Sequence, residues 1–231
     1  MKLLLVAADA MEFHGILAHS SEVRRPAVAV DWARLATLGG HAVMLAANGA
    51  GAKRASAAVE RALEQFDADA VISTGFCGAL DAELAIADVV VGSEVTAAGR
   101  RFAAAIPSSA RSHHAGVVCS IDRVAQTAGE KRALRASGGT AVEMEAGGVV
   151  ERAAAKGIKF YCIRVVTDLA GEDMANDFNL ALRPDGHFAT ISILSRALRD
   201  PLVRLPELVR LRNRCVRASR ALGEFIADCR Y

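Results

Sequence analysis

The sequence predicts an α/β protein folded as a single domain over residues 1–231, with helices on both faces of a mixed central sheet. Short apolar runs alternate with segments of helical spacing along the whole chain. A length of 231 residues suits one large α/β domain, and no linker rich in Pro, Gly or Ser divides it. Hydrophobic residues make up 52% of the chain and aromatic residues only 5%, so aliphatic side chains must fill the core.

The first part of the chain is expected to alternate between strands and helices. Residues 2–8 read KLLLVAA, a continuous apolar run typical of a central parallel strand. Gly39-Gly40 is a strong signal for a hairpin between two further strands. Strands are therefore expected at residues 2–8, 32–37, 41–47, 70–74 and 88–95, and helices at residues 10–19 and 52–66.

The second part continues the alternation. Gly157 is placed to end a helix in the left-handed conformation, just before a buried strand. We expect loops at residues 75–78 and 99–115, the second of them irregular and mobile. Strands are expected at residues 116–120 and 158–166, helices at 127–135 and 144–156, and a last long helix with Leu205, Leu208, Leu211, Cys215, Leu222, Phe225 and Cys229 on one face.

Composition and charge exclude several classes of function. A formal net charge of +2 does not indicate a nucleic-acid-binding protein. No apolar run reaches the length of a signal-peptide core or a membrane span, so we expect a cytoplasmic protein. Five cysteines without CxxC spacing indicate reduced core thiols. The pair His113-His114 is a weak signal, and the chain has neither a Walker A nor a complete GxGxxG motif, so we expect no metal and no cofactor.

Two carboxylates lie where ligands of such sheets bind, beyond the carboxyl ends of the strands. In Glu143-Met144-Glu145, at the predicted start of a helix, one glutamate could simply stabilise the helix N-terminus. The alternative, which we favour for Glu145, is that it binds vicinal hydroxyls with Met144 as an apolar floor. Asp168 ends a buried strand; it either caps a turn or, in an apolar pocket, retains a proton and acts as a general acid.

Four motifs occur in order: AME at 10–12, STGFCGAL at 73–80, AVEMEA at 141–146 and RVVTDLAG at 164–171. Together they resemble the purine nucleoside phosphorylase and nucleosidase superfamily, most closely its methylthioadenosine/S-adenosylhomocysteine nucleosidase branch, over roughly residues 1–195. The resemblance implies a nucleoside phosphorylase-like fold. It also implies a homodimer or larger homo-oligomer that cleaves the N-glycosidic bond of an adenosine-type purine nucleoside such as methylthioadenosine.

The resemblance also assigns roles to residues. It implies that Glu145 holds the ribose hydroxyls, that Met144 packs under the sugar, and that Asp168 donates a proton to a purine ring nitrogen. Such an acid would stabilise the negative charge that develops on the departing base. The remaining residues expected to bind substrate are Glu143, Thr74, Gly75, Phe76, Cys77, Gly78, Val124 and Ala125.

Three departures from the family pattern leave alternatives open. Where the nucleosidases have a run of three glutamates, this chain has Glu12-Phe13-His14, so water is activated either by Glu12 from a shifted register or by His14. Val124 and Ala125 replace an aromatic residue and an isoleucine, so stacking on the purine is lost. Ser73 replaces an arginine of the hexameric phosphorylases, which favours hydrolysis over phosphorolysis with phosphate as second substrate.

The helical tail at about residues 196–231 is basic. Between residues 196 and 220 there are eight arginines but only two acidic residues, Asp200 and Glu207. A solvated helix face is the simplest interpretation, and weak contact with an anionic membrane surface is the alternative. The tail also resembles that of hopanoid-associated phosphorylase-like proteins, which implies adenine release from a lipid-linked adenosine. A nucleoside-binding protein without catalysis is the remaining alternative.

Overall fold

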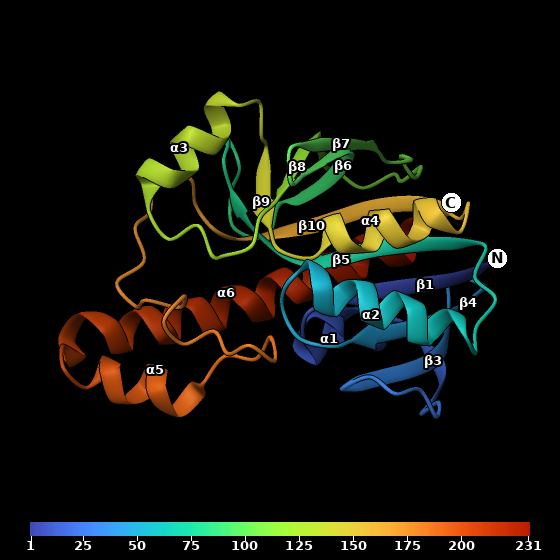
Figure 1. Ribbon diagram of the computed structural model, residues 1–231, viewed down its shortest axis with the longest axis horizontal. Coiled ribbons are helices and arrows are strands. Elements are labelled where there is room, and N and C mark those ends of the chain that lie inside the picture. The colour runs from blue at the N-terminus through green and yellow to red at the C-terminus, as the bar shows by residue number, and fades with distance from the viewer.

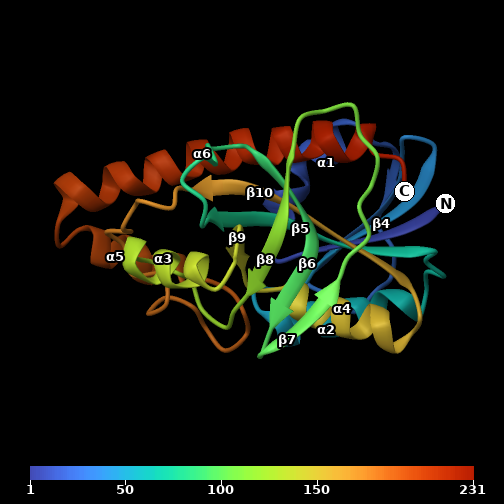
Figure 2. The same cartoon turned by 90° about the horizontal axis from the view of Figure 1, so that it is seen from above.

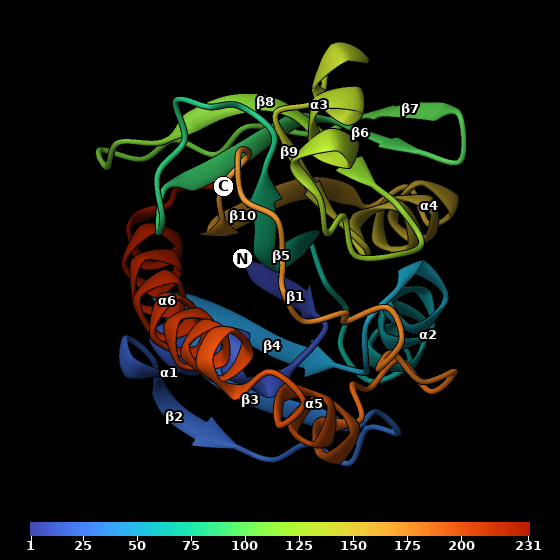
Figure 3. The same cartoon turned by 90° about the vertical axis from the view of Figure 1, so that its left-hand side faces the viewer.

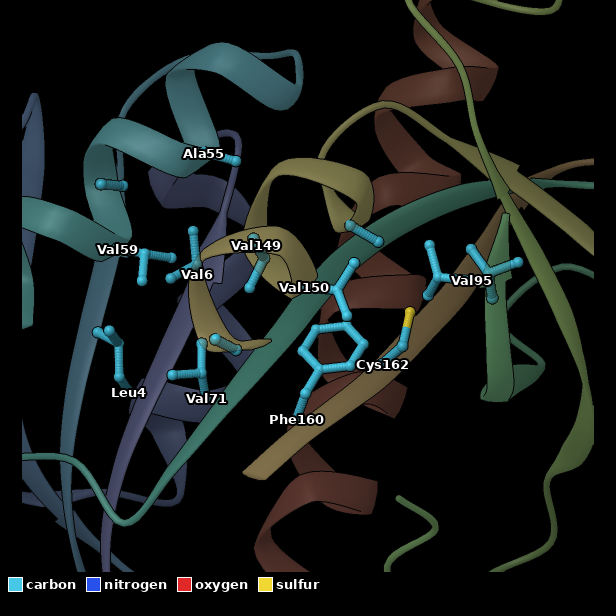
Figure 4. Close-up of a cluster of buried hydrophobic side chains, with 14 of the residues drawn as sticks. Leu4, Val6, Ala55, Val59, Val71, Val95, Val149, Val150, Phe160 and Cys162 are labelled. Carbon is cyan, nitrogen blue, oxygen red and sulfur yellow. The ribbon is translucent and has the colours of Figure 1, made fainter. Parts of the chain in front are cut away.

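The first strand, β1 (Lys2–Ala7), sends alternate side chains into two separate hydrophobic cores. In the computed structural model, which describes residues 1–231, Leu4 and Val6 pack beneath two helices on one face of the sheet (Figure 4). Leu3 and Leu5 pack on the opposite face against a third and a fourth helix. Burial on both faces explains the continuous apolar run. The prediction of an α/β domain with helices on both faces is confirmed (Figure 1).

The sheet is mixed and partly closed. From the edge inwards, β2, β3, β4, β1 and β5 pair in that order. On the side away from β1, β5 pairs with β10, while its last residues, Gly78 and Ala79, pair with β9 on the same side as β1. Strands β8 and β6 connect β9 to β10, so five strands form a closed ring. The remaining strands are β2 (Ser21–Arg24), β3 (Trp32–Leu38), β4 (His41–Ala47), β5 (Ala70–Ala79), β6 (Val89–Ala97), β7 (Arg100–Ala103), β8 (His114–Ser120), β9 (Ala141–Glu143) and β10 (Lys159–Asp168).

The helices form two outer layers, visible from the end of the molecule in Figure 3. Helices α2 (Ala52–Leu63) and α4 (Ala146–Ala155) cover one face, while α1 (His14–Ala18) and α6 (Pro201–Asp228) cover the other. Gly148 allows α4 to approach α2 closely, because a Cβ there would overlap the Ala52 carbonyl group. The other helices are η1 (Ala10–Phe13), α3 (Ala128–Ala136) and α5 (Thr190–Ala197).

Several predicted elements differ from the observed ones. Residues 75–78 are not a loop, because β5 continues through them and pairs with β10 on one side and β9 on the other. Glu143 ends strand β9 and therefore does not open the following helix. Within residues 99–115, β7 adds to β6 and Ser108 bridges to Arg230, so much of this segment is tied to the sheet and the C-terminus. None of the helices is long and apolar enough to span a membrane.

Candidate active site

A cavity of about 370 Å³ opens at the carboxyl ends of β1, β5, β9 and β10. Figure 2 shows β5 and β10 pointing towards this end, where α3 and α5 also lie. The volume of this cavity falls in the range of small-molecule sites. The wall is largely nonpolar, but it contains five acidic residues: Asp9, Glu12, Glu143, Glu145 and Asp168. The sheet therefore gathers the predicted carboxylates around one cavity.

The two glutamates of the VEME segment have different surroundings. The Glu143 carboxylate accepts hydrogen bonds from the backbone N–H groups of Glu145 and Ala146, both at 2.9 Å, and so stabilises the start of α4. Glu145 occupies the N-cap position, but its side chain does not cap its own helix. Instead it accepts a bond of 3.0 Å from the N–H of Gly51, at the start of α2. Glu143 is thus the helix-stabilising carboxylate, and Glu145 faces the cavity.

A fully buried arginine lies behind these glutamates. Arg164 on β10 forms an ion pair with Glu143 and a longer one of 3.5 Å with Glu145. It also donates to the Ser73 hydroxyl at 2.5 Å and to the Thr74 carbonyl at 3.0 Å. Arg164 was not among the residues predicted from the sequence, although an arginine inside the apolar run FYCIRVV was a usable signal, because a buried cation requires partners.

Burial and charge set the protonation of Glu145. Desolvation, followed by repulsion from Glu143, raises the pKa of Glu145 to about 8, and Arg164 opposes part of this rise. At neutral pH the Glu145 carboxyl group can therefore either donate or accept a hydrogen bond. Both capacities suit a group that binds sugar hydroxyls.

Asp168 is held by a lysine that was not among the predicted site residues. Its Oδ1 atom accepts from the Lys131 ammonium group, and its Oδ2 atom has only a long 3.4 Å contact with the Thr167 hydroxyl. A Cβ at Gly78 would lie 2.8 Å from Oδ1, so the glycine provides the space that this carboxyl group needs. Desolvation raises the pKa of Asp168, although Lys131 lowers it. An acid whose pKa is raised in this way can carry a proton into a reaction.

Glu12 lines the cavity, whereas His14 does not. The Glu12 carboxylate accepts from the backbone N–H groups of Phe76, Ala8 and Asp9, at 2.6, 2.9 and 2.8 Å. Burial nevertheless raises the pKa of Glu12. His14 begins α1 with an exposed side chain on the outside of the molecule. The η1 turn that brings Glu12 inward carries His14 outward.

The other predicted binding residues separate into two groups. Met144, Phe76, Cys77, Gly78, Val124 and Ala125 line the cavity together with the acids. Thr74 and Gly75 do not line it. Thr74 is fully buried, and its carbonyl oxygen holds Arg164. Gly75 has φ of +128°, and a Cβ there would overlap the Glu12 carboxylate, so its part is to make room for that side chain.

A second wall of the cavity comes from a part of the chain where we predicted no binding residues. It is formed by nonpolar side chains from residues 174–215, in the segment before α5 and in the two last helices. These residues are Met174, Phe178, Phe188, Ile193, Leu211 and Cys215. Their spacing in the sequence is irregular, and only the tertiary structure brings them to one site.

Charge at the cavity is unevenly distributed. Arg123 is the only Lys or Arg side chain of the wall, against five carboxylates. Arg123 itself pairs with Glu130 at 3.2 Å. The buried Arg164 is already held by four protein groups. The cavity therefore offers little positive charge to an anionic ligand.

Comparison with known protein families identifies the chain. The model of a family described as the phosphorylase superfamily matches residues 2–110 and 96–185, which together span most of the sheet and the acidic cavity wall. The chain belongs to the phosphorylase superfamily. The predicted resemblance is confirmed. The matched residues end at residue 185, before α5 and α6.

Relatives of this phosphorylase superfamily member include nucleosidases. A 5′-methylthioadenosine/S-adenosylhomocysteine nucleosidase of Colwellia psychrerythraea is 28% identical over 176 residues, which cover 61% of this chain and 72% of the relative. The solved structure of the Campylobacter jejuni enzyme of that name has a TM-score of 0.71 at 16% identity, covering 98% of this chain and 97% of the other. That of S-adenosylhomocysteine nucleosidase from Streptococcus pyogenes, in complex with 5-methylthiotubericidin, has a TM-score of 0.67 at 20% identity, covering 91% and 95%. These structures share the fold of the superfamily member described here.

Proposed function

We propose that the protein is a nucleosidase that hydrolyses the N-glycosidic bond of an adenosine-type nucleoside and releases adenine. One observation carries the proposal: a carboxyl group with raised pKa, Asp168, and a carboxyl group suited to sugar hydroxyls, Glu145, line the same cavity. The Colwellia relative, a nucleosidase acting on methylthioadenosine and S-adenosylhomocysteine, supports the same substrate class.

The proposed reaction uses the two carboxyl groups at different places. As the bond between the sugar and the purine breaks, its electron pair stays with the base, and Asp168 gives its proton to a purine ring nitrogen. Positive charge develops on the sugar, where Glu145 binds the ribose hydroxyls. The oxygen of a water molecule forms the new bond to the sugar carbon, and the proton that this water loses passes to a carboxylate beside the sugar. Exchange with solvent then returns that carboxylate and Asp168 to their starting protonation states.

Glu12 is the better candidate for positioning that water. Its carboxylate is fixed by three backbone N–H groups and lines the cavity, whereas His14 lies on the outer surface. Of the two alternatives left open by the sequence, the geometry supports Glu12. Because its pKa is raised by burial, it can accept a proton more readily than an ordinary glutamate.

Hydrolysis is supported over phosphorolysis by the charge of the cavity. A phosphate ion would enter a site with five acidic side chains and one arginine, and that arginine is already paired with Glu130. The ionised members of this acidic set would repel the phosphate. A neutral water molecule is not repelled in this way.

Incubating the pure protein with methylthioadenosine, with and without phosphate, tests the proposal. We expect adenine, measured by chromatography, at the same rate in both conditions, with no sugar phosphate formed. Adenine released only with phosphate would establish a phosphorylase instead. No adenine in either condition, together with thermal stabilisation by the nucleoside, would indicate a binding protein.

The outer face of α6 supports an additional proposal: we propose weak contact with an anionic membrane surface. Leu202, Val209 and Val216 recur every seven residues on α6 and are exposed, Leu202 by 87%. Exposed Arg210 and Arg217 flank this stripe. A dimer formed through this face would bring arginines of the two copies together, and their like charges would repel. Anionic lipid headgroups have the opposite charge and therefore complement the face. A membrane-bound substrate with a nonpolar substituent would then meet the nonpolar cavity wall formed by residues 174–215.

Vesicle sedimentation tests this contact. We expect the protein to sediment with vesicles that contain phosphatidylglycerol and not with phosphatidylcholine alone, and we expect salt to release it. The double change Leu202→Asp and Val209→Asp should abolish sedimentation, while Val23→Asp on the distant edge strand β2 should not. Equal binding to both vesicle types, or no loss in the double variant, would exclude the proposed surface.

A further inference from the structure

Helix α3 attaches to the rest of the protein in an unusual way. Its only buried residue is Lys131, whose side chain is 0% exposed. Helices normally bury nonpolar side chains, and burying a charged group costs free energy unless a partner compensates for it. Lys131 also lies near the N-terminus of α3, where the helix dipole disfavours a cation. Neither nonpolar packing nor the helix dipole explains a lysine at this position.

The partner that compensates for the burial of Lys131 is Asp168. The ammonium group donates to Asp168 Oδ1 and, at 2.8 Å, to the carbonyl oxygen of Leu169, the next residue along the chain. Both contacts lie at the carboxyl end of β10. Because Lys131 does not line the cavity and Asp168 does, the lysine lies behind the carboxyl group as seen from the substrate. It can therefore act on the reaction only through Asp168.

The contacts of Asp168 distinguish its two oxygen atoms. Lys131 occupies Oδ1, and the hydrogen bond that Oδ2 accepts is a long one of 3.4 Å from the Thr167 hydroxyl. A proton on Asp168 is consequently favoured on Oδ2, because Oδ1 already accepts from a cation. This arrangement leaves one defined oxygen to carry the proton that the proposed reaction transfers.

We propose that Lys131 is a positioning residue for proton transfer: it holds Oδ1 of Asp168 so that Oδ2 presents the proton to the leaving base. The inference rests on the proposed function, since it concerns the acid of that reaction. It adds a residue outside the cavity, on an element that the four sequence motifs do not include. It also predicts how the activity depends on pH.

Lys131 is the only cation in direct contact with Asp168, although other groups lie around it. Glu172 is neutralised by bonds of 2.6 and 2.8 Å from Arg214 on α6. The thiols of Cys77 on β5 and Cys215 on α6 also influence this region, and burial raises the pKa of both. These groups stay unchanged when Lys131 is replaced, so a change in the titration of Asp168 can be assigned to the lysine.

The decisive variant is Lys131→Met, with Arg132→Met as the matched control. Arg132 is the next residue of α3, and its side chain is exposed and has no polar partner. Without the ammonium group, Asp168 should hold its proton to higher pH, so the alkaline limb of the kcat profile should move up by about one pH unit or more. We also expect kcat at its optimum to fall by about tenfold with little change in KM, because the proton is no longer directed. Arg132→Met should keep the profile of the unaltered protein.

Two further measurements keep the test decisive. If Lys131→Met fails to fold, Lys131→Gln retains a donor without the charge, and its profile should shift in the same direction. A carbon NMR titration of Asp168 in the free protein reports the same shift without any turnover, so it separates this inference from the proposed function. A folded variant in which neither the profile nor the Asp168 titration moves would overturn the role of Lys131.

Discussion

Replacing Asp168 with asparagine should lower kcat for adenine release by about a hundredfold to ten-thousandfold, because the amide cannot transfer a proton to the departing base. The alkaline limb of the pH profile should disappear with it, since that limb reports loss of the proton from Asp168. Substrate binding should change little, because an amide has nearly the same shape as a carboxyl group. Chromatography of adenine across pH provides the measurement.

The same substitution also leaves a buried cation without its partner, so activity must be separated from stability. Removing one member of a buried pair typically costs about 3–5 kcal/mol. The double variant Asp168→Asn with Lys131→Met removes both charges and should recover part of that loss while remaining inactive. Asp122→Asn, in the exposed loop before α3, serves as the matched control and should retain full activity. More than a tenth of the original activity in folded Asp168→Asn would show that another group protonates the base.

Replacing Arg164 with methionine should strongly destabilise the protein. Glu143 and Glu145 would remain buried without a cation, and the free energy of unfolding should fall by about 3–5 kcal/mol. Urea unfolding followed by circular dichroism measures it. Arg152→Met provides the control, because Arg152 pairs with Glu60 on the surface, where an ion pair contributes about 1 kcal/mol or less.

The destabilisation by Arg164→Met should depend on pH. The pKa of Glu145 is about 8 in the folded protein and near 4.5 when the chain is unfolded, so between these values the folded state binds more protons. The free energy of unfolding therefore rises as pH falls through this range, and without Arg164 the effect should be larger. The deficit of the variant should be greatest above pH 8 and smallest near pH 5. A deficit that is constant across this range would show that lost packing, rather than unpaired carboxylates, destabilises the variant.

The sequence identified those parts of the site in which local pattern and position in the sheet suffice. The apolar run of β1, the Gly39-Gly40 hairpin and the alternation of strands with helices depend on neighbouring residues only. Glu145 and Asp168 were both expected beyond the ends of buried segments of an α/β sheet, which is where ligands of such sheets bind. For this reason the amino-acid sequence is sufficient to predict the fold class and the two principal carboxylates.

Other features depended on contacts between distant parts of the chain. Residues 75–78 form a strand because β9 and β10 supply hydrogen-bond partners on both sides, and a glycine-rich segment read alone looks like a loop. The choice between Glu12 and His14 depended on the direction of a single helical turn. No pattern in the sequence joins Lys131 to Asp168, which are separated by 37 residues.

The sequence by itself therefore determined the fold class, the superfamily resemblance and the edge of the sheet at which the reaction is expected. Those features follow from hydrophobic periodicity and from short motifs, which are local. The tertiary structure decided how each carboxyl group is charged and held: Arg164 behind Glu145, Lys131 behind Asp168, and three backbone N–H groups around Glu12. Protonation depends on burial and on charges a few ångströms away, and those are set only when distant segments pack together.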